Sequence, residues 1–121
     1  QDVAIAVRGD NLQLPSRAAT ALTVVVNELV QNSLEHAFIG RAAGRIDISL
    51  ARTPDALMII VRDDGVGLPN EIEPNLGLEI AEALIGEDLH GELQFNRLHA
   101  GAEVVIRLPR SAESSDPSAR E

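Results

Sequence analysis

The segment Asn27–Phe38 reads NELVQNSLEHAF, and its spacing of apolar residues predicts an amphipathic helix. We expect the helix to begin near Pro15 and Ser16, because proline suits a first helical turn, and to run to about Phe38. Its apolar stripe consists of Leu22, Val25, Val26, Leu29, Val30, Ser33 and Ala37, and its polar side carries Glu28, Gln31, Asn32 and Glu35. Glu28 and Asn32 are therefore neighbours, one helical turn apart.

The Glu28–Asn32 pair has two interpretations. An acid and an amide at this spacing more often belong to a solvated helix face. Asparagine inside a helix is nevertheless a local cost, because its side chain competes for backbone hydrogen bonds. The functional alternative is a carboxylate that polarises a nucleophile or water, beside an amide oxygen that binds Mg²⁺ together with substrate phosphates. Other motifs must decide between the two.

Length and composition limit the possible classes of protein. The 121 residues suit one domain with one core, and no apolar run approaches the length of a membrane span. A net charge of −9, with 2% aromatic residues, disfavours a nucleic-acid surface. The absence of cysteine excludes disulfides and thiolate sites and fits a cytoplasmic protein. The chain does not start with Met, so we expect a fragment of a longer protein.

The remaining elements form two hairpins and a second helix. Alternating apolar residues predict strands at about 3–8, 45–52, 92–98 and 104–108, and a continuous apolar run predicts a central strand at 57–61. Helical spacing resumes at 76–85, where we expect Gly86 to end the helix. This order predicts a two-layer α/β sandwich, with a mixed, largely antiparallel sheet and the helices on one face. The domain should span residues 1–109, followed by a disordered tail at 110–121.

Two glycine motifs follow the predicted strands. Asp63-Asp64-Gly65-Val66-Gly67 comes directly after the central strand, so the Asp63 carboxylate can accept a hydrogen bond from an exocyclic amine. Gly77 stands at the start of the second helix, where free N–H groups favour an anion such as phosphate. Each motif alone is also explained by an ordinary turn or helix entry.

Taken in order, these motifs resemble the three sequence boxes of the GHKL ATPases. The boxes are Glu28-x-x-x-Asn32-x-x-x-His36, Asp63-x-Gly65-x-Gly67 and Gly77-Leu78, with Gly101 before the last strand. Within that superfamily, NELVQNSLEHAF and the closing run DLHGELQF…GAEVVIRLP look most like the ATP-binding catalytic domain of bacterial sensor histidine kinases. The resemblance covers about residues 3–109 and implies the Bergerat ATP-binding fold.

The resemblance also implies roles for individual residues. Asp63 would bind the adenine amine, and Asn32 would bind the Mg²⁺ that bridges the phosphates. Gly65, Gly67 and Gly77 would shape the ATP pocket and its lid, with Leu78 and Gly101 beside them. Glu28 matches the acid that polarises the nucleophile in members that hydrolyse ATP or phosphorylate serine, whereas most histidine kinases have Asn there.

Several positions depart from the family pattern. Glu35 stands where a phosphate-binding Lys is frequent, and Ala102 replaces the usual Thr near the adenine. The lid at 68–75 is short, with little aromatic or basic content. His36 could contact phosphate or lie at the helix end, which we favour slightly, and we expect His90 and His99 to have no role.

The resemblance favours a kinase domain that binds Mg²⁺ and ATP and transfers the γ-phosphate to a histidine. That histidine would lie on a separate helical dimerisation domain of the same protein, through which a response regulator would be reached. The domain would be inactive alone, cytoplasmic, and without nucleic-acid or membrane contacts. The alternatives are an anti-sigma-factor serine kinase and a non-catalytic domain that senses nucleotide. Gyrase-like and chaperone ATPases are disfavoured, because they need a second domain that supplies a Lys.

Overall fold

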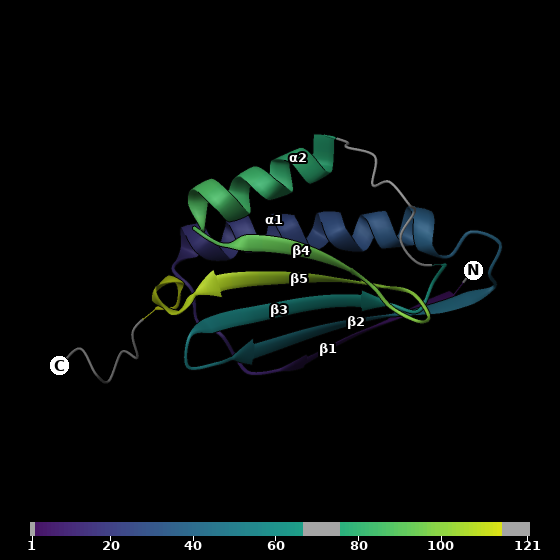
Figure 1. The fold of residues 1–121 in the computed structure, drawn as a ribbon, viewed down its shortest axis with the longest axis horizontal. Helices are drawn as coiled ribbons and strands as arrows, with labels where there is room; N and C mark the ends of the chain where they lie inside the picture. Colours follow the sequence, from purple (N-terminus) through teal and green to yellow (C-terminus); the bar gives the residue numbers. More distant parts are fainter. Residues whose placement is uncertain (1, 67–75, 115–121) are drawn as a thin grey trace.

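The computed structural model describes residues 2–66 and 76–114 as one sheet covered on one face by helices (Figure 1). The strands are β1 (Asp2–Gly9), β2 (Ala43–Arg52), β3 (Ala56–Asp63), β4 (Glu92–Arg97) and β5 (Ala102–Pro109). Helix α1 (Ser16–Asn32) continues into a π-helical turn, η1 (Ser33–Ala37), and helix α2 (Leu76–Ala83) continues into a second one, η2 (Leu84–Asp88). A short 3₁₀ turn, η3 (Arg110–Ala112), follows β5.

The sheet has the strand order β1-β2-β3-β5-β4. β1 pairs with β2 in parallel, and the other neighbours pair antiparallel. The parallel pair is the one joined by the long helix, as a parallel connection requires. The two hairpins make the antiparallel pairs β2–β3 and β4–β5, and the third antiparallel pair, β3–β5, joins one hairpin to the other. These pairings confirm the predicted mixed, largely antiparallel sheet and the two-layer α/β arrangement.

The hydrophobic core lies between the helices and the sheet. Val25 and Leu29 of α1 are buried against it, as the apolar stripe predicts, and Ile85 of η2 is buried from the second helix. From the sheet, Ile46, Ile59 and Ile106 contribute side chains with no exposed surface. Alternate residues of each strand therefore face the helices, and the residues between them face the other way.

The outer face of the sheet carries ion pairs. Arg8 and Arg45 both contact Asp47, each through a nitrogen 2.9 Å from its Oδ1, and Arg62 pairs with Glu103 across β3 and β5. Hydrogen bonds from Arg45 and then Arg8 lower the pKa of Asp47. A hydrogen bond from Arg62 likewise lowers the pKa of Glu103. Charged side chains therefore gather on the face of the sheet that the helices do not cover.

The segment after β5 is attached to the end of the sheet where β3 begins. The Arg52 Nε donates a 2.7 Å hydrogen bond to Glu113, and Ser114 N–H donates a 2.7 Å hydrogen bond to the Gln13 carbonyl. Arg110 donates to the Thr53 carbonyl at 2.7 Å. We expected the disordered tail to begin at 110, whereas residues 110–114 make these contacts. The rest of the predicted tail, 115–121, lies outside the described residues.

The second helix ends later than predicted. Gly86 lies inside η2, so the prediction that it stops the helix is wrong. The chain leaves the helix at His90 instead, whose φ of 54° is left-handed, and Gly91 N–H donates to the Ile85 carbonyl at 2.7 Å. Glycine weakens a helix without forbidding it, so the residue in the left-handed conformation decides the end. Neither helix in the described ranges is long and apolar enough to cross a membrane.

Candidate functional site

Asp63 is the last residue of β3, and no other polar or charged side chain of the described residues is buried. Its side chain is 7% exposed and lies on the helix-covered face of the sheet. Asp63 Oδ2 accepts a 3.2 Å hydrogen bond from the Ser33 hydroxyl, and Oδ1 accepts a 3.0 Å hydrogen bond from Gly65 N–H. These bonds compensate its burial and fix the direction of the carboxylate.

The Ser33 hydroxyl connects the first box to the second. Ser33 directly follows Asn32 and is the first residue of the π-helical turn. Both side chains are half-buried, as is that of Glu28 one turn earlier. The hydrogen bond from Ser33 to Asp63 therefore holds the end of β3 beside the helix that carries Glu28 and Asn32. π-helical turns are rare and are frequently found at functional sites.

Glu28 lies against the start of α2. A Cβ placed on Gly77 would be 1.7 Å from Glu28 Oε1, so the carboxylate occupies the space next to this glycine. The first turn of a helix has free N–H groups and a partial positive charge, which favour a carboxylate there. This contact joins the first and third boxes and gives a steric reason for glycine at position 77.

Gly65 allows the loop after β3 to pass close to the end of η1. A Cβ on Gly65 would be 2.3 Å from the Ala37 carbonyl oxygen, closer than real Cβ atoms come. That same oxygen accepts a 2.8 Å hydrogen bond from Val66 N–H. The Asp63-x-Gly65 motif is therefore packed on the helix end through backbone contacts that a larger residue at 65 would prevent.

Gly101 packs against the backbone of Asp63. Its φ is 101°, and a Cβ there would be 1.9 Å from the Asp63 carbonyl oxygen. The turn between β4 and β5 thus packs on the backbone of the Asp63 residue. Position 101 excludes other residues for two reasons, the left-handed backbone and the close contact.

Asp64 has a structural role. Its side chain accepts a 2.8 Å hydrogen bond from Arg45 N–H, and its carbonyl oxygen accepts one from the Arg41 guanidinium. Asp64 is exposed, unlike Asp63. The two adjacent acids therefore differ: Asp63 points into the layer between sheet and helices, and Asp64 ties the end of β3 to the start of β2.

Other predicted site residues lie elsewhere. The side chains of His36 and Glu35 are 70% and 64% exposed, with 3.8 Å between His36 Nε2 and Glu35 Oε2. His36 is in the last turn of η1, the helix-end position that we favoured. Leu78 is buried in the core. Gly67 and the predicted lid at 68–75 lie outside the described residues, and the proposed ligand roles of all these residues stay predictions.

The oxygen donors at this site fit a hard divalent cation that is held mainly by substrate phosphates and waters. Asn32 offers an amide oxygen and Glu28 a carboxylate, one helical turn apart and both half-buried. In the described part of the chain, no three His, Cys, Asp or Glu side chains lie together as a metal site. Mg²⁺ keeps waters and is often bound by one or two protein oxygens plus substrate phosphates, so this small set suffices.

Ser33 was missed as a site residue by the sequence analysis, which placed it in the apolar stripe. Its polar side chain on the core-facing side of the helix was the available signal, because a hydroxyl there needs a partner. Arg41, which donates to the carbonyl of Asp64 beside Asp63, was missed as well. Nothing in the sequence alone distinguishes it from the other arginines, since its position depends on how the loops and strands pair.

The comparison with protein families decides the assignment. The model of the family described as histidine kinase-, DNA gyrase B- and HSP90-like ATPase matches residues 18–112. The chain belongs to this family. The match confirms the resemblance inferred from the three boxes and runs from Ala18 in α1 to the end of η3, including the elements that carry Glu28, Asn32 and Asp63.

Sensor histidine kinases are similar to this ATPase domain in sequence. Sensor histidine kinase PdtaS of Mycobacterium tuberculosis is 42% identical over 107 residues, which is 84% of this chain and 21% of that protein. The chain therefore spans about a fifth of the length of this curated relative.

Solved histidine kinases share the fold. The histidine kinase domain of a blue-light-activated histidine kinase from Erythrobacter litoralis superposes with a TM-score of 0.81 and 32% identity, covering 90% of this chain and 52% of that one. Histidine kinase ThkA, in complex with response regulator protein TrrA, superposes with a TM-score of 0.68 and 25% identity, covering 89% of this chain and 34% of that one. The ATP-binding catalytic domains of histidine kinases are thus the structural class of this chain.

Proposed function

We propose that this ATPase domain binds Mg·ATP and transfers the γ-phosphate to a histidine on a separate helical domain of the same full-length protein. The observation that carries the proposal is the Ser33–Asp63 hydrogen bond, together with the contact between Glu28 and Gly77. These two contacts bring together residues from all three boxes. An ordinary solvated helix face would not bury Asp63 or hold Glu28 against a second helix.

In this proposal Asp63 recognises the base. Asp63 is buried and already accepts hydrogen bonds from Ser33 and Gly65, and a carboxylate has enough lone pairs to accept one more from the exocyclic amine of adenine. A guanine presents an oxygen at that place, which the carboxylate would repel. The site therefore selects adenine nucleotides.

Asn32 would hold the metal, and Glu28 would face the reacting phosphate. Bound Mg²⁺ would neutralise phosphate charge, which matters in a chain of net charge −9 without lysine. The attacking imidazole nitrogen forms a bond to the γ-phosphorus while the bond to the ADP oxygen breaks, so ADP is the leaving group. Glu28 would orient the imidazole by accepting its N–H. Catalysis then consists mainly of positioning.

A serine kinase of the anti-sigma-factor type is the second candidate. It is favoured by Glu28 itself, a carboxylate that could accept the proton of a serine hydroxyl. The sequence relatives favour the histidine kinase. A non-catalytic nucleotide sensor is a third candidate, favoured by Glu35 and Ala102, which replace residues that the family uses at phosphate and adenine.

The partners belong to the proposal as well. The phosphoacceptor would lie in the same protein outside these 121 residues, and a response regulator would receive the phosphate through it. ThkA, which shares the fold, is described in complex with response regulator protein TrrA. We further propose a cytoplasmic site of action, without nucleic-acid or membrane contact by this domain.

The test uses the full-length protein with γ-labelled ATP. Phosphohistidine is hydrolysed by acid and survives base, whereas phosphoserine survives acid. We expect label that is lost in acid and kept in base. Acid-stable label would establish the serine kinase, and ATP binding without any label would establish the non-catalytic sensor. A protein that does not bind ATP would contradict all three.

A further inference from the structure

Asp63, Ala102 and Arg97 form one row across three strands. Asp63 of β3 pairs with Ala102 of β5, and Ala102 pairs with Arg97 of β4. Directly paired residues of antiparallel strands carry their side chains on the same face of the sheet. Two strand spacings separate the ends of the row, about 10 Å. The residue between them has the small methyl side chain of alanine.

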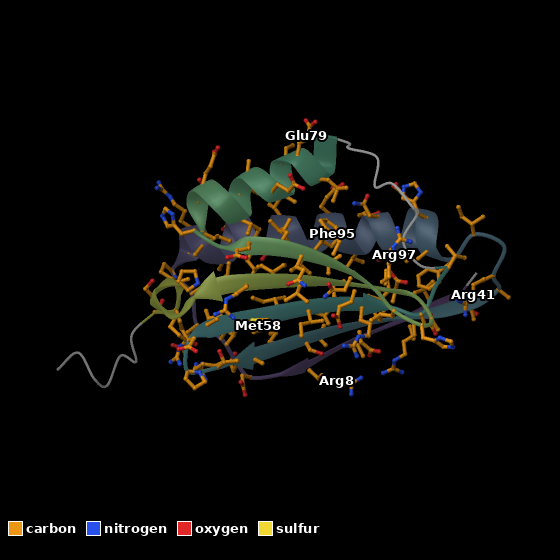
Figure 2. All side chains as sticks on the ribbon, viewed as in Figure 1. Arg8, Arg41, Met58, Glu79, Phe95 and Arg97 are labelled. Atoms are coloured by element: carbon orange, nitrogen blue, oxygen red, sulfur yellow. The ribbon has the colours of Figure 1, made fainter. Side chains whose placement is uncertain are left out.

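The face occupied by this row follows from the neighbours of Arg97. Asn96 donates a 3.1 Å hydrogen bond to Glu103, which pairs with Arg62 on the outer face of the sheet. Because strand residues alternate, Arg97 points to the helix-covered face, the face of Asp63. Figure 2 places Arg97 on the helix side of β4, with Phe95 on the same side and Met58 on the opposite one.

Few other groups at this end of the sheet can pack against a flat ring. The chain has two phenylalanines and no tryptophan or tyrosine. Phe38 has no exposed surface, and Phe95 packs against the core. The guanidinium of Arg97 is planar, and its residue is exposed.

Five other arginines lie away from this row. Three lie on the outer face of the sheet and two at the opposite end, where β3 begins: Arg8, Arg45, Arg62, Arg52 and Arg110. Arg97 instead lies in line with the buried carboxylate of Asp63, two strands away.

We propose that the guanidinium of Arg97 packs on the adenine base whose amine Asp63 binds, with Ala102 as the small residue beneath the ring. The proposal rests on the proposed function and adds a base-contacting residue outside the three boxes. Arginine stacks on bases through its planar, weakly hydrated guanidinium, and a cation over a ring adds electrostatic attraction. Ala102 suits this arrangement, because a larger side chain would fill the space between Asp63 and Arg97.

The test measures the affinity of the 121-residue chain for ATP, ADP and AMP by displacement of a fluorescent ATP analogue. The variants are Arg97→Ala and Arg97→Lys, and the matched control is Arg107→Ala. Arg107 is also an exposed arginine, on the neighbouring strand β5, but it faces outward and contacts Met58. We expect Arg97→Ala to weaken all three nucleotides by the same factor, about 5- to 20-fold, because cation–ring contacts have that magnitude. Arg107→Ala should leave the affinities unchanged.

Comparing the three nucleotides separates an effect on base binding from an effect on phosphate binding. A loss that grows from AMP to ATP would assign Arg97 to the phosphates and overturn the proposal, and an unchanged affinity in Arg97→Ala would overturn it as well. If Arg97→Lys restored the full affinity, a positive charge would be sufficient and the planar guanidinium would not be needed. That outcome would also overturn the proposal. A parent chain that binds no ATP would overturn the proposed function together with this inference.

Discussion

The Ser33 hydroxyl donates a 3.2 Å hydrogen bond to the Asp63 carboxylate, and this bond joins the helix of the first box to the strand of the second. Ser33 is next to Asn32, so the bond sets the position of the proposed metal ligand relative to the proposed base-binding acid. The two residues are 30 positions apart in the sequence. The first prediction concerns this pair.

Asp63→Asn should weaken ATP binding by about 1–3 kcal/mol, because one acceptor oxygen becomes a donor that faces the adenine amine. Ser33→Ala should have a smaller effect in the same direction, since Asp63 keeps its hydrogen bond from Gly65. Isothermal titration calorimetry on both variants gives the comparison. Parent-like affinity in Asp63→Asn would refute the adenine role.

Asn32→Ala should remove most of the dependence of ATP affinity on Mg²⁺. The chain has no lysine, so few protein groups can neutralise the triphosphate in place of Mg²⁺. Affinities measured with Mg²⁺ and with a chelator, in parent and variant, provide the readout. If Mg²⁺ enhances binding equally in both proteins, the metal is held by other groups.

Glu28→Gln should leave ATP affinity equal or slightly higher while it slows phosphotransfer in the full-length protein by about 10²-fold or more. The carboxylate can orient a nucleophile, but it repels phosphate charge. Single-turnover transfer, ATP affinity and melting temperature are measured on the same variant. Loss of binding and stability together would indicate a structural role, and unchanged transfer would exclude a catalytic one.

Gly101→Ala should destabilise the domain by about 1–3 kcal/mol, because alanine at φ 101° is strained and its Cβ would meet the Asp63 carbonyl oxygen. Gly86→Ala is the matched control: no atom lies within 4 Å of its Cβ, and its backbone lies in a helical turn. Alanine there should be neutral or stabilising by up to about 1 kcal/mol. Urea denaturation compares them, and equal stabilities would contradict the packing of the β4–β5 turn on Asp63.

Glu113→Gln should lower the melting temperature near neutral pH and reduce the acid sensitivity of the domain. The hydrogen bond from Arg52 lowers the pKa of Glu113 from 4.5 to about 2. A carboxylate with a lowered pKa stabilises the fold above the unfolded value and loses that contribution as pH falls through the window from 4.5 to about 2. Melting curves of parent and variant should therefore converge across this window. A constant difference down to pH 2 would exclude the ion pair as the cause.

Sequence periodicity was sufficient for the secondary structure and for much of the candidate site. The apolar stripe of the first helix and the two-residue period of the strands identified the elements, because these patterns report which side of an element is buried. Motif order then singled out Glu28, Asn32 and Asp63, and the structure brings their segments together through Ser33 and Gly77.

Contacts between distant segments could not be predicted in the same way. Strand register decides that Asn96 of β4 faces outward, and it also decides that Arg97 lies in one row with Ala102. The second helix continues past Gly86 to Asp88, and its end depends on the left-handed backbone of His90, which periodicity does not reveal. Residues 110–114, which look like a polar tail, contact Gln13, Arg52 and Thr53 through hydrogen bonds that the sequence pattern does not show.

The sequence by itself determined the elements, the family and the residue types of the site, because local periodicity and motif order are properties of the chain. Only the tertiary structure decided which groups meet. Ser33 bonds to Asp63, Glu28 lies on Gly77, and Gly101 packs on the Asp63 backbone. The physical reason is that such contacts arise from strand pairing and helix packing between residues tens of positions apart, where a single hydroxyl or a missing Cβ leaves little trace in a sequence pattern.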